Sequence, residues 1–186
     1  MNSTPGHEPD PSLYIHQLGN ESPFHREAAA WSLGELGSPR AARPLAGLLL
    51  REISSVERTG FLDHNDVVRA TVEAIRRIGA TEALYALVKA LCVLSRARGV
   101  DEQTVVEIVD TLGEVGGPSA VREAADRVTR EARSRRAPLP ALRTVGWVLL
   151  TRLSLCGDAA VATLHRLAQG GPGALRPIAV RVCATV

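Results

Sequence analysis

Apolar residues recur at helical spacing in four segments of similar length along the chain. The segments read HREAAAWSLGELG at 25–37, VVRATVEAIRRIG at 67–79, TVVEIVDTLGEVG at 104–116 and VGWVLLTRLSLCG at 145–157. Each has an aliphatic residue four positions before its final glycine, at positions 33, 75, 112 and 153. The spacing predicts one amphipathic helix per segment, ending at the glycine because glycine readily adopts the left-handed conformation of a helix C-terminus.

A second apolar stripe follows each of these glycines. In every stripe the later members lie three and seven residues after the first, which is the core face of an amphipathic helix. The stripes are Ala42, Leu45 and Leu49; Leu84, Leu87 and Leu91; Val121, Ala124 and Val128; and Val161, Leu164 and Ala168. The chain is therefore predicted to be all-α, a helical hairpin repeated four times, because one hairpin cannot bury its apolar face without neighbours.

The ends of such a stack need covering. Residues 10–19 predict a short helix that caps the first repeat, and we expect it to cover Trp31, whose counterparts in the aligned repeats are Glu73, Asp110 and Thr151. The apolar segment 174–182 predicts a final helix without a partner, which either closes the stack or contacts another chain. Residues 1–9 are expected to be a disordered tail and residues 10–186 a single domain.

The first repeat resembles a known family. An early arginine (Arg26), paired alanines and the Leu-Gly-x-Leu-Gly pattern that ends at Gly37 resemble the HEAT repeat, in the short bacterial variety also found in phycobilin lyases. The resemblance covers about residues 22–169, although Arg69 lies one place late in the second repeat, and Arg76 and Ser154 replace the first glycine in the second and fourth. It implies a right-handed α-solenoid of about four hairpins with an N-terminal capping helix and a C-terminal partial repeat.

Composition narrows the class of protein further. Hydrophobic residues make up 45% of the chain and aromatic residues only 3%, which argues against an all-β fold. The net charge is +2, too small to mark a nucleic-acid or membrane protein by bulk charge.

The first eleven residues lack the apolar core of a signal peptide, and the longest apolar run, 145–155, is too short to span a membrane. The three cysteines match no paired framework, so we expect them to be reduced and the protein to be cytoplasmic.

The resemblance to HEAT repeats implies that the second helices line a concave surface. Aligning the repeats places six polar side chains in two rows on those helices, and we take them as the candidate partner-binding residues: Arg43, Tyr85, Arg122, Lys89, Asp126 and Arg166. Tyrosine and arginine often dominate binding energy where they are enclosed, so this groove suits a peptide or an acidic segment. The alternatives are a ladder of ion pairs between repeats and a solvated helix face.

Two other polar stretches carry weaker signals. The arginine-rich stretch 127–136 suggests phosphate binding, but Glu123/Arg127, Asp126/Arg130 and Glu131/Arg135 are stabilising i,i+4 pairs of a solvated helix, so we do not expect a nucleic-acid partner. The loop 57–66, the longest connector, contains Asp63, His64 and Asp66. Three ligands in four consecutive residues rarely fit one metal ion, so we interpret Asp66 as a helix N-cap and predict no metal site.

The sequence contains no GxSxG, HExxH or phosphate-binding glycine loop, so no catalytic residue and no cofactor is predicted. We interpret the protein as a non-enzymatic module that binds another protein or peptide. One alternative is a small-molecule or chromophore-binding accessory protein, or a lyase-like protein of a biosynthetic pathway. A weaker alternative is a DNA-lesion-binding relative of the HEAT-like glycosylases. Self-association through the C-terminal helix also remains open.

Overall fold

The computed structural model describes residues 10–134 and 139–185, and the regular structure of these residues is helical. The elements are α1 (Pro11–Gln17), α2 (Pro23–Leu36), η1 (Pro39–Ala41), α3 (Ala42–Thr59), α4 (Asn65–Ile78), η2 (Thr81–Ala83), α5 (Leu84–Leu94), α6 (Glu102–Ser134), α7 (Leu139–Ser154), α8 (Asp158–Gly170) and α9 (Arg176–Cys183). The all-α prediction is confirmed, and the expected tail 1–9 lies outside the described residues.

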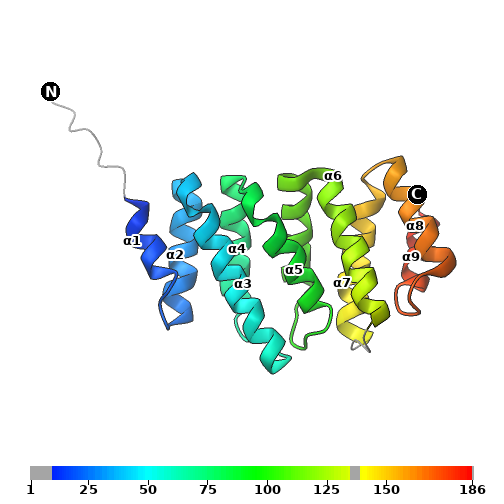
Figure 1. Ribbon diagram of the computed structural model, residues 1–186, viewed down its shortest axis with the longest axis horizontal. Helices are drawn as coiled ribbons and strands as arrows, with labels where there is room; N and C mark the ends of the chain where they lie inside the picture. The colour runs from blue at the N-terminus through cyan, green and yellow to red at the C-terminus, as the bar shows by residue number, and fades with distance from the viewer. Residues whose placement is uncertain (1–9, 135–138, 186) are drawn as a thin grey trace.

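The helices form two layers that lie side by side, and in each layer successive helices follow one another along the long axis of the molecule (Figure 1). One layer contains α2, α4, the first half of α6, α7 and α9, and we call its outer surface the first-helix face. The other contains α3, α5, the second half of α6 and α8, and its outer surface is the second-helix face. Each helix packs mainly on its neighbours in the same layer and on its hairpin partner, as expected for stacked hairpins.

Two of the four predicted helix ends follow the sequence prediction. Gly37 and Gly79 end α2 and α4 with φ of 61° and 67°. The end predicted at Gly157 is wrong, because α7 ends at Ser154 and Gly157 is the N-cap of α8, with φ 83° and ψ −173°. The third repeat differs, because α6 runs through Gly116 and the break falls at Gly117, with φ 66° and ψ −170°. Pro118 explains the shift, since the residue before a proline avoids helical ψ. Gly117 therefore divides α6 into the two predicted helices of its hairpin.

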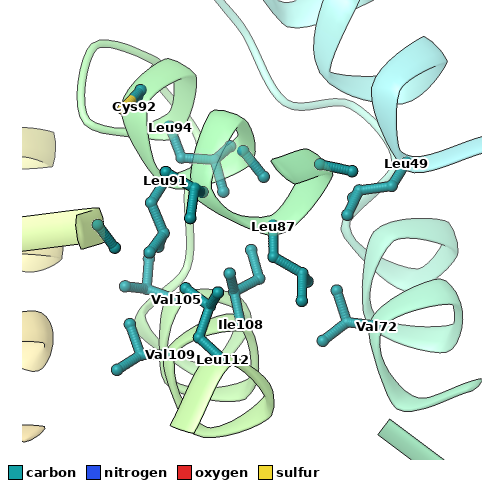
Figure 2. Close-up of a cluster of buried hydrophobic side chains, with 14 of the residues drawn as sticks. Leu49, Val72, Leu87, Leu91, Cys92, Leu94, Val105, Ile108, Val109 and Leu112 are labelled. Carbon is teal, nitrogen blue, oxygen red and sulfur yellow. The ribbon is translucent and has the colours of Figure 1, made fainter. Parts of the chain in front are cut away.

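The core is built almost entirely from alanine, leucine and valine. Figure 2 shows Leu87 of α5 between Val72 of α4 and Ile108 of α6, so that successive repeats share one apolar interior. Small residues let the first helices approach closely: a Cβ atom at Gly34 would lie 2.9 Å from the Cα atom of Ala74. The aliphatic positions 33, 75, 112 and 153 of the repeat pattern are all fully buried.

The two end helices are present, but one expectation about them is wrong. α1 packs on α2 as predicted. Trp31, however, is not covered as expected. Its side chain is 40% exposed, and the guanidinium carbon of Arg77 lies 5.5 Å from the ring centroid, on the α4 side of α2. α9 packs on α7 and α8 at the other end of the stack.

The connector between α3 and α4 is shorter than expected. α3 continues to Thr59, so residues 60–64 form the connection, and among the described residues the connector 95–101 is longer. The two connectors pair, since Leu62 N donates to Arg98 O at 3.0 Å and Arg98 N donates to Gly60 O at 2.8 Å. Asp66 lies in the first turn of α4 and His64 occupies the N-cap, so the N-cap interpretation of Asp66 is wrong.

Candidate functional site

Two of the six candidate residues lie together in a hollow of about 450 Å³ on the second-helix face. Tyr85 and Lys89 line this hollow with side chains from α3, α5 and the second half of α6. We call it the basic hollow, because four basic side chains line it against two carboxylates. The basic residues are Lys89, Arg96, Arg127 and Arg130, and the acidic residues are Glu57 and Glu131.

Tyr85 is an exposed aromatic side chain in the lining of the basic hollow. Its relative accessibility is 59%, although it lies at the start of a helix whose other face is buried. The guanidinium carbon of Arg127 lies 5.7 Å from its ring centroid, within the range of a cation–π interaction. Arg127 also contacts Glu123 at 3.4 Å, one of the three predicted i,i+4 pairs. Tyr85 and Arg127 thus form an exposed aromatic–cation pair across two helices.

Ion pairs connect the second helices beside this aromatic–cation pair. Glu57 of α3 lies 3.5 Å from Lys89 Nζ in α5 and 3.8 Å from Arg96 Nη2 in the connector that follows α5. Arg96 also lies 3.4 Å from Glu131 of α6. These contacts form part of the ion ladder considered from the sequence, so Lys89 has an intramolecular partner in addition to lining the hollow.

The other candidate residues lie outside the basic hollow. Asp126 and Arg166 form an ion pair of 3.8 Å between α6 and α8, but both side chains are about half exposed or more, and such pairs contribute little to stability. Arg43 and Arg122 are exposed, and neither has an ion-pair partner within residues 10–134 and 139–185. The two aligned rows therefore do not converge on one site.

A groove of about 420 Å³ on the first-helix face was not predicted from the sequence. We call it the acidic groove. It is lined by α2, α4 and the first half of α6, with Trp31 at one side, and two arginines, Arg69 and Arg76, lie among its six carboxylates. The carboxylates are Glu27, Asp66, Glu73, Glu107, Asp110 and Glu114. One signal was available in the sequence, because Trp31, Glu73 and Asp110 occupy the same place in successive repeats and all three line the groove.

Glu73 accepts more hydrogen bonds from arginine side chains than the other carboxylates of the acidic groove. Arg76 donates to it from Nε and Nη2 at 2.8 Å each, and Arg77 Nε donates at 2.7 Å. Partial burial raises the pKa of Glu73, but the hydrogen bonds and positive charges of Arg77 and Arg76 outweigh burial and lower its pKa below the usual value. Glu73 is therefore ionised whenever the protein is near neutral pH.

Other carboxylates of the groove pair between repeats. Arg69 Nε lies 3.2 Å from Glu107, Arg76 Nη1 lies 3.3 Å from Glu114, and Arg152 Nε lies 3.5 Å from Asp110. Glu27 and Asp66 differ from these, since neither forms an ion pair within the described part of the chain. Their negative charges are the uncompensated part of the groove.

A third hollow, of about 640 Å³, lies further along the first-helix face between α6, α7 and α9. Trp147 is 40% exposed there, and the guanidinium carbon of Arg181 lies 5.7 Å from its ring centroid. The arrangement repeats that of Trp31 and Arg77, with an aromatic ring on one first helix and an arginine on the next.

Metal and membrane sites receive no structural support. No group of three or more histidine, cysteine or carboxylate side chains in the described residues has the geometry of a metal site, and this includes the stretch 63–66. Within the same residues no helix combines the length and apolar character of a membrane span. Cys92, Cys156 and Cys183 are all free thiols.

Comparison with protein families agrees with the resemblance read from the sequence. Residues 26–51 match the model of the PBS lyase HEAT-like repeat, and they comprise most of α2, all of η1 and the first part of α3. A search of curated proteins found no significant match. The matched segment is the hairpin that contains Arg26, the paired alanines and Gly37, so this first hairpin is similar to a HEAT-like repeat.

Proposed function

We propose that the protein is a non-enzymatic interaction module whose basic hollow binds an acidic segment of a partner protein. The observation that carries this proposal is the exposed ring of Tyr85 among four basic side chains on the second-helix face. Exposed tyrosine and arginine side chains on a rigid surface are typical anchors of protein interfaces. In this proposal residues 10–186 act as one solenoid domain that presents the hollow.

The charge balance of the hollow supports an acidic partner. Glu57 and Glu131 offset part of the positive charge through Lys89 and Arg96. Arg130 Nε donates to the backbone carbonyl of Asp126 at 3.4 Å, a contact that leaves its positive charge uncompensated. A carboxylate of a partner would therefore accept hydrogen bonds from the guanidinium groups beside Tyr85 and would be attracted by their positive charge.

The alternatives have less support. A chromophore or small apolar ligand needs a pocket lined mainly by apolar and aromatic groups, whereas charged side chains predominate in the basic hollow and the acidic groove, and three charged side chains lie beside Trp147 in the third hollow. For nucleic acid, two arginines of the stretch have intramolecular contacts, Arg127 with Glu123, and Arg133 Nη2 with Gly170 O at 3.2 Å. Residues 135–136 of the arginine-rich stretch lie outside the described residues.

Fluorescence anisotropy with two labelled peptides of equal length tests the proposal. One peptide carries glutamate and leucine, and the other carries lysine in place of glutamate. We expect the acidic peptide to bind more tightly, and we expect Tyr85→Ala and Arg127→Gln each to weaken its binding about tenfold, or about 1.4 kcal/mol.

Arg40→Gln is the matched control, because Arg40 is exposed in η1 and does not line the basic hollow. If Arg40→Gln weakens the acidic peptide as much as Arg127→Gln does, only bulk charge is being measured and the proposal fails. Preferential binding of a DNA duplex, with a steep loss of affinity in added salt, would favour the nucleic-acid alternative instead.

A further inference from the structure

We infer that the acidic groove on the first-helix face is a second docking site, one that binds a cationic segment of a partner protein. This site is separate from the basic hollow, since α2, α4 and the first half of α6 form it and the second-helix layer contributes none of its lining. The occupant expected is a short stretch rich in arginine or lysine, in extended or irregular conformation.

The charge of the lining is the first argument. Six carboxylates face two arginines in the groove, although the chain as a whole has a net charge of +2. Four of the carboxylates are paired: Glu107 with Arg69, Glu114 with Arg76, Glu73 with Arg76 and Arg77, and Asp110 with Arg152. Glu27 and Asp66 remain as negative charges without an ion-pair partner in the described residues, and a cation of the partner would supply one.

The aromatic side chain beside these charges is the second argument. Trp31 lies one helical turn after Glu27 on α2 and remains 40% exposed, even though Arg77 covers part of its ring. Tryptophan is the aromatic residue with the strongest attraction for cations, and it is enriched among the residues that dominate interface energy. A lysine or arginine of the partner can therefore place its alkyl stem against Trp31 and its charge beside Glu27.

The dimensions of the groove agree with a peptide segment. Three neighbouring helices at about 8–10 Å spacing give a width of roughly 20 Å, which about six extended residues can cross. Ala70 and Val72 of α4, both almost fully buried, lie at the floor of the groove between the charged rows. A chain that crosses the groove would meet Trp31 on α2 first, then α4, and then the carboxylates of α6.

The fluorescence of Trp31 provides a direct test. The chain contains two tryptophans, so Trp147→Phe leaves Trp31 as the only one. We titrate this variant with a peptide of about eight residues that alternates arginine and glycine, and with the same peptide carrying glutamate in place of arginine. We expect the cationic peptide alone to change the Trp31 emission, with an affinity that falls as salt is added.

Glu27→Gln is the main variant and Glu35→Gln its control. Both changes remove one carboxylate from α2, but Glu35 is exposed and lies outside the groove lining. We expect Glu27→Gln to weaken the cationic peptide about fivefold to tenfold and Glu35→Gln to weaken it less than twofold. Asp66→Asn is expected to act like Glu27→Gln, and circular dichroism verifies that each variant is folded.

Several results would overturn the inference. One is equal weakening by Glu27→Gln and Glu35→Gln, which would mean that the peptide senses only overall charge. Another is loss of cationic peptide binding in Tyr85→Ala, which would place the peptide on the second-helix face. A third is salt-sensitive dimerisation in sedimentation that Glu27→Gln abolishes, because the occupant would then be a second copy of this chain. If the acidic peptide fails to bind the basic hollow, this test is unaffected, because each site is tested with its own peptide and its own variants.

Discussion

Arg26 and Glu52 form a buried ion pair that joins the two helices of the first hairpin. Arg26 Nε lies 2.9 Å from Glu52 Oε1, and the two side chains are 9% and 6% exposed. Arg26 Nη1 also donates to the carbonyls of Asn20 and Glu21, which connects the α1–α2 turn to the same pair. The early arginine of the repeat pattern is thus a structural residue in this hairpin, while Arg69, near the corresponding place of the next repeat, lines the acidic groove.

Breaking this pair from one side should destabilise the protein strongly. Arg26→Met leaves the carboxylate of Glu52 buried without its main partner, and the loss of one member of a buried pair costs about 3–5 kcal/mol. We expect a decrease of that size in the free energy of unfolding, measured by urea denaturation followed by circular dichroism.

The double variant Arg26→Met/Glu52→Leu separates the charge effect from lost packing. With no buried charge remaining, it should be more stable than Arg26→Met alone. If the effects of the two single substitutions simply add, the pair contributes no coupling energy and this account of it is incorrect.

Gly34 allows the close approach of α2 and α4. A Cβ atom there would lie 2.9 Å from Ala74 Cα and 3.1 Å from Ala74 Cβ, and backbone atoms cannot move aside cheaply. We expect Gly34→Ala to lower the free energy of unfolding by about 1–3 kcal/mol, because overpacking outweighs the gain in helix propensity.

Gly47 is the matched control for Gly34. It lies in the middle of α3, and no atom lies within 4 Å of the place where its Cβ would be. Gly47→Ala should therefore stabilise the protein by about 0.5–1 kcal/mol through helix propensity alone. Thermal unfolding of the two variants side by side tests the contrast, and destabilisation by both would contradict it.

The sequence predicted the hairpins well because their signals are local. Apolar spacing identifies the buried face of each helix, and the glycines at 37 and 79 fix two helix ends without reference to distant residues. The break in α6 was placed one residue early, at Gly116, although the local signal was present in Pro118. A rule about the residue before proline corrects that placement.

The candidate site was harder to predict, because it depends on how side chains from different repeats meet. The alignment found Tyr85 and Lys89, which do share a hollow, but it also grouped them with Arg43 and Arg166, which lie elsewhere. The acidic groove went unrecognised because Trp31 was expected to lie beneath α1. Trp31 instead lies beside Arg77 of the next repeat, a contact that periodicity alone does not encode.

Cys92 should react slowly with thiol reagents. Burial raises the pKa of its thiol, the negative charge of Glu131 adds to the increase, and the side chain is only 8% exposed. Cys156 and Cys183 are half-buried and should react faster. With Ellman's reagent near pH 8 we expect two thiols to react in the native protein and the third only on unfolding.

Cys92→Ala identifies the slow thiol. The variant should keep the fast phase and lose the slow one. If the fast phase loses amplitude instead, the thiol of Cys92 is accessible and the packing of α5 described above is incorrect.

The ion-paired Glu73 predicts how stability depends on acid pH. Its pKa is lowered in the folded protein by Arg77 and Arg76, so the ionised form stabilises the fold, and this contribution is complete above the ordinary glutamate pKa of about 4.5. The contribution disappears as the pH falls below that value and through the lowered pKa of the folded state. Glu73→Gln removes the titrating group, so its free energy of unfolding should decrease less than that of the wild type between pH 6 and pH 3.5.

Near neutral pH the variant should lose about 1 kcal/mol or less, because the paired arginines are well solvated. Glu82→Gln, which removes an exposed carboxylate with no ion pair in the described residues, should retain the acid sensitivity of the wild type. Equal acid profiles for Glu73→Gln and the wild type would show that this carboxylate is not held by its two arginines in solution.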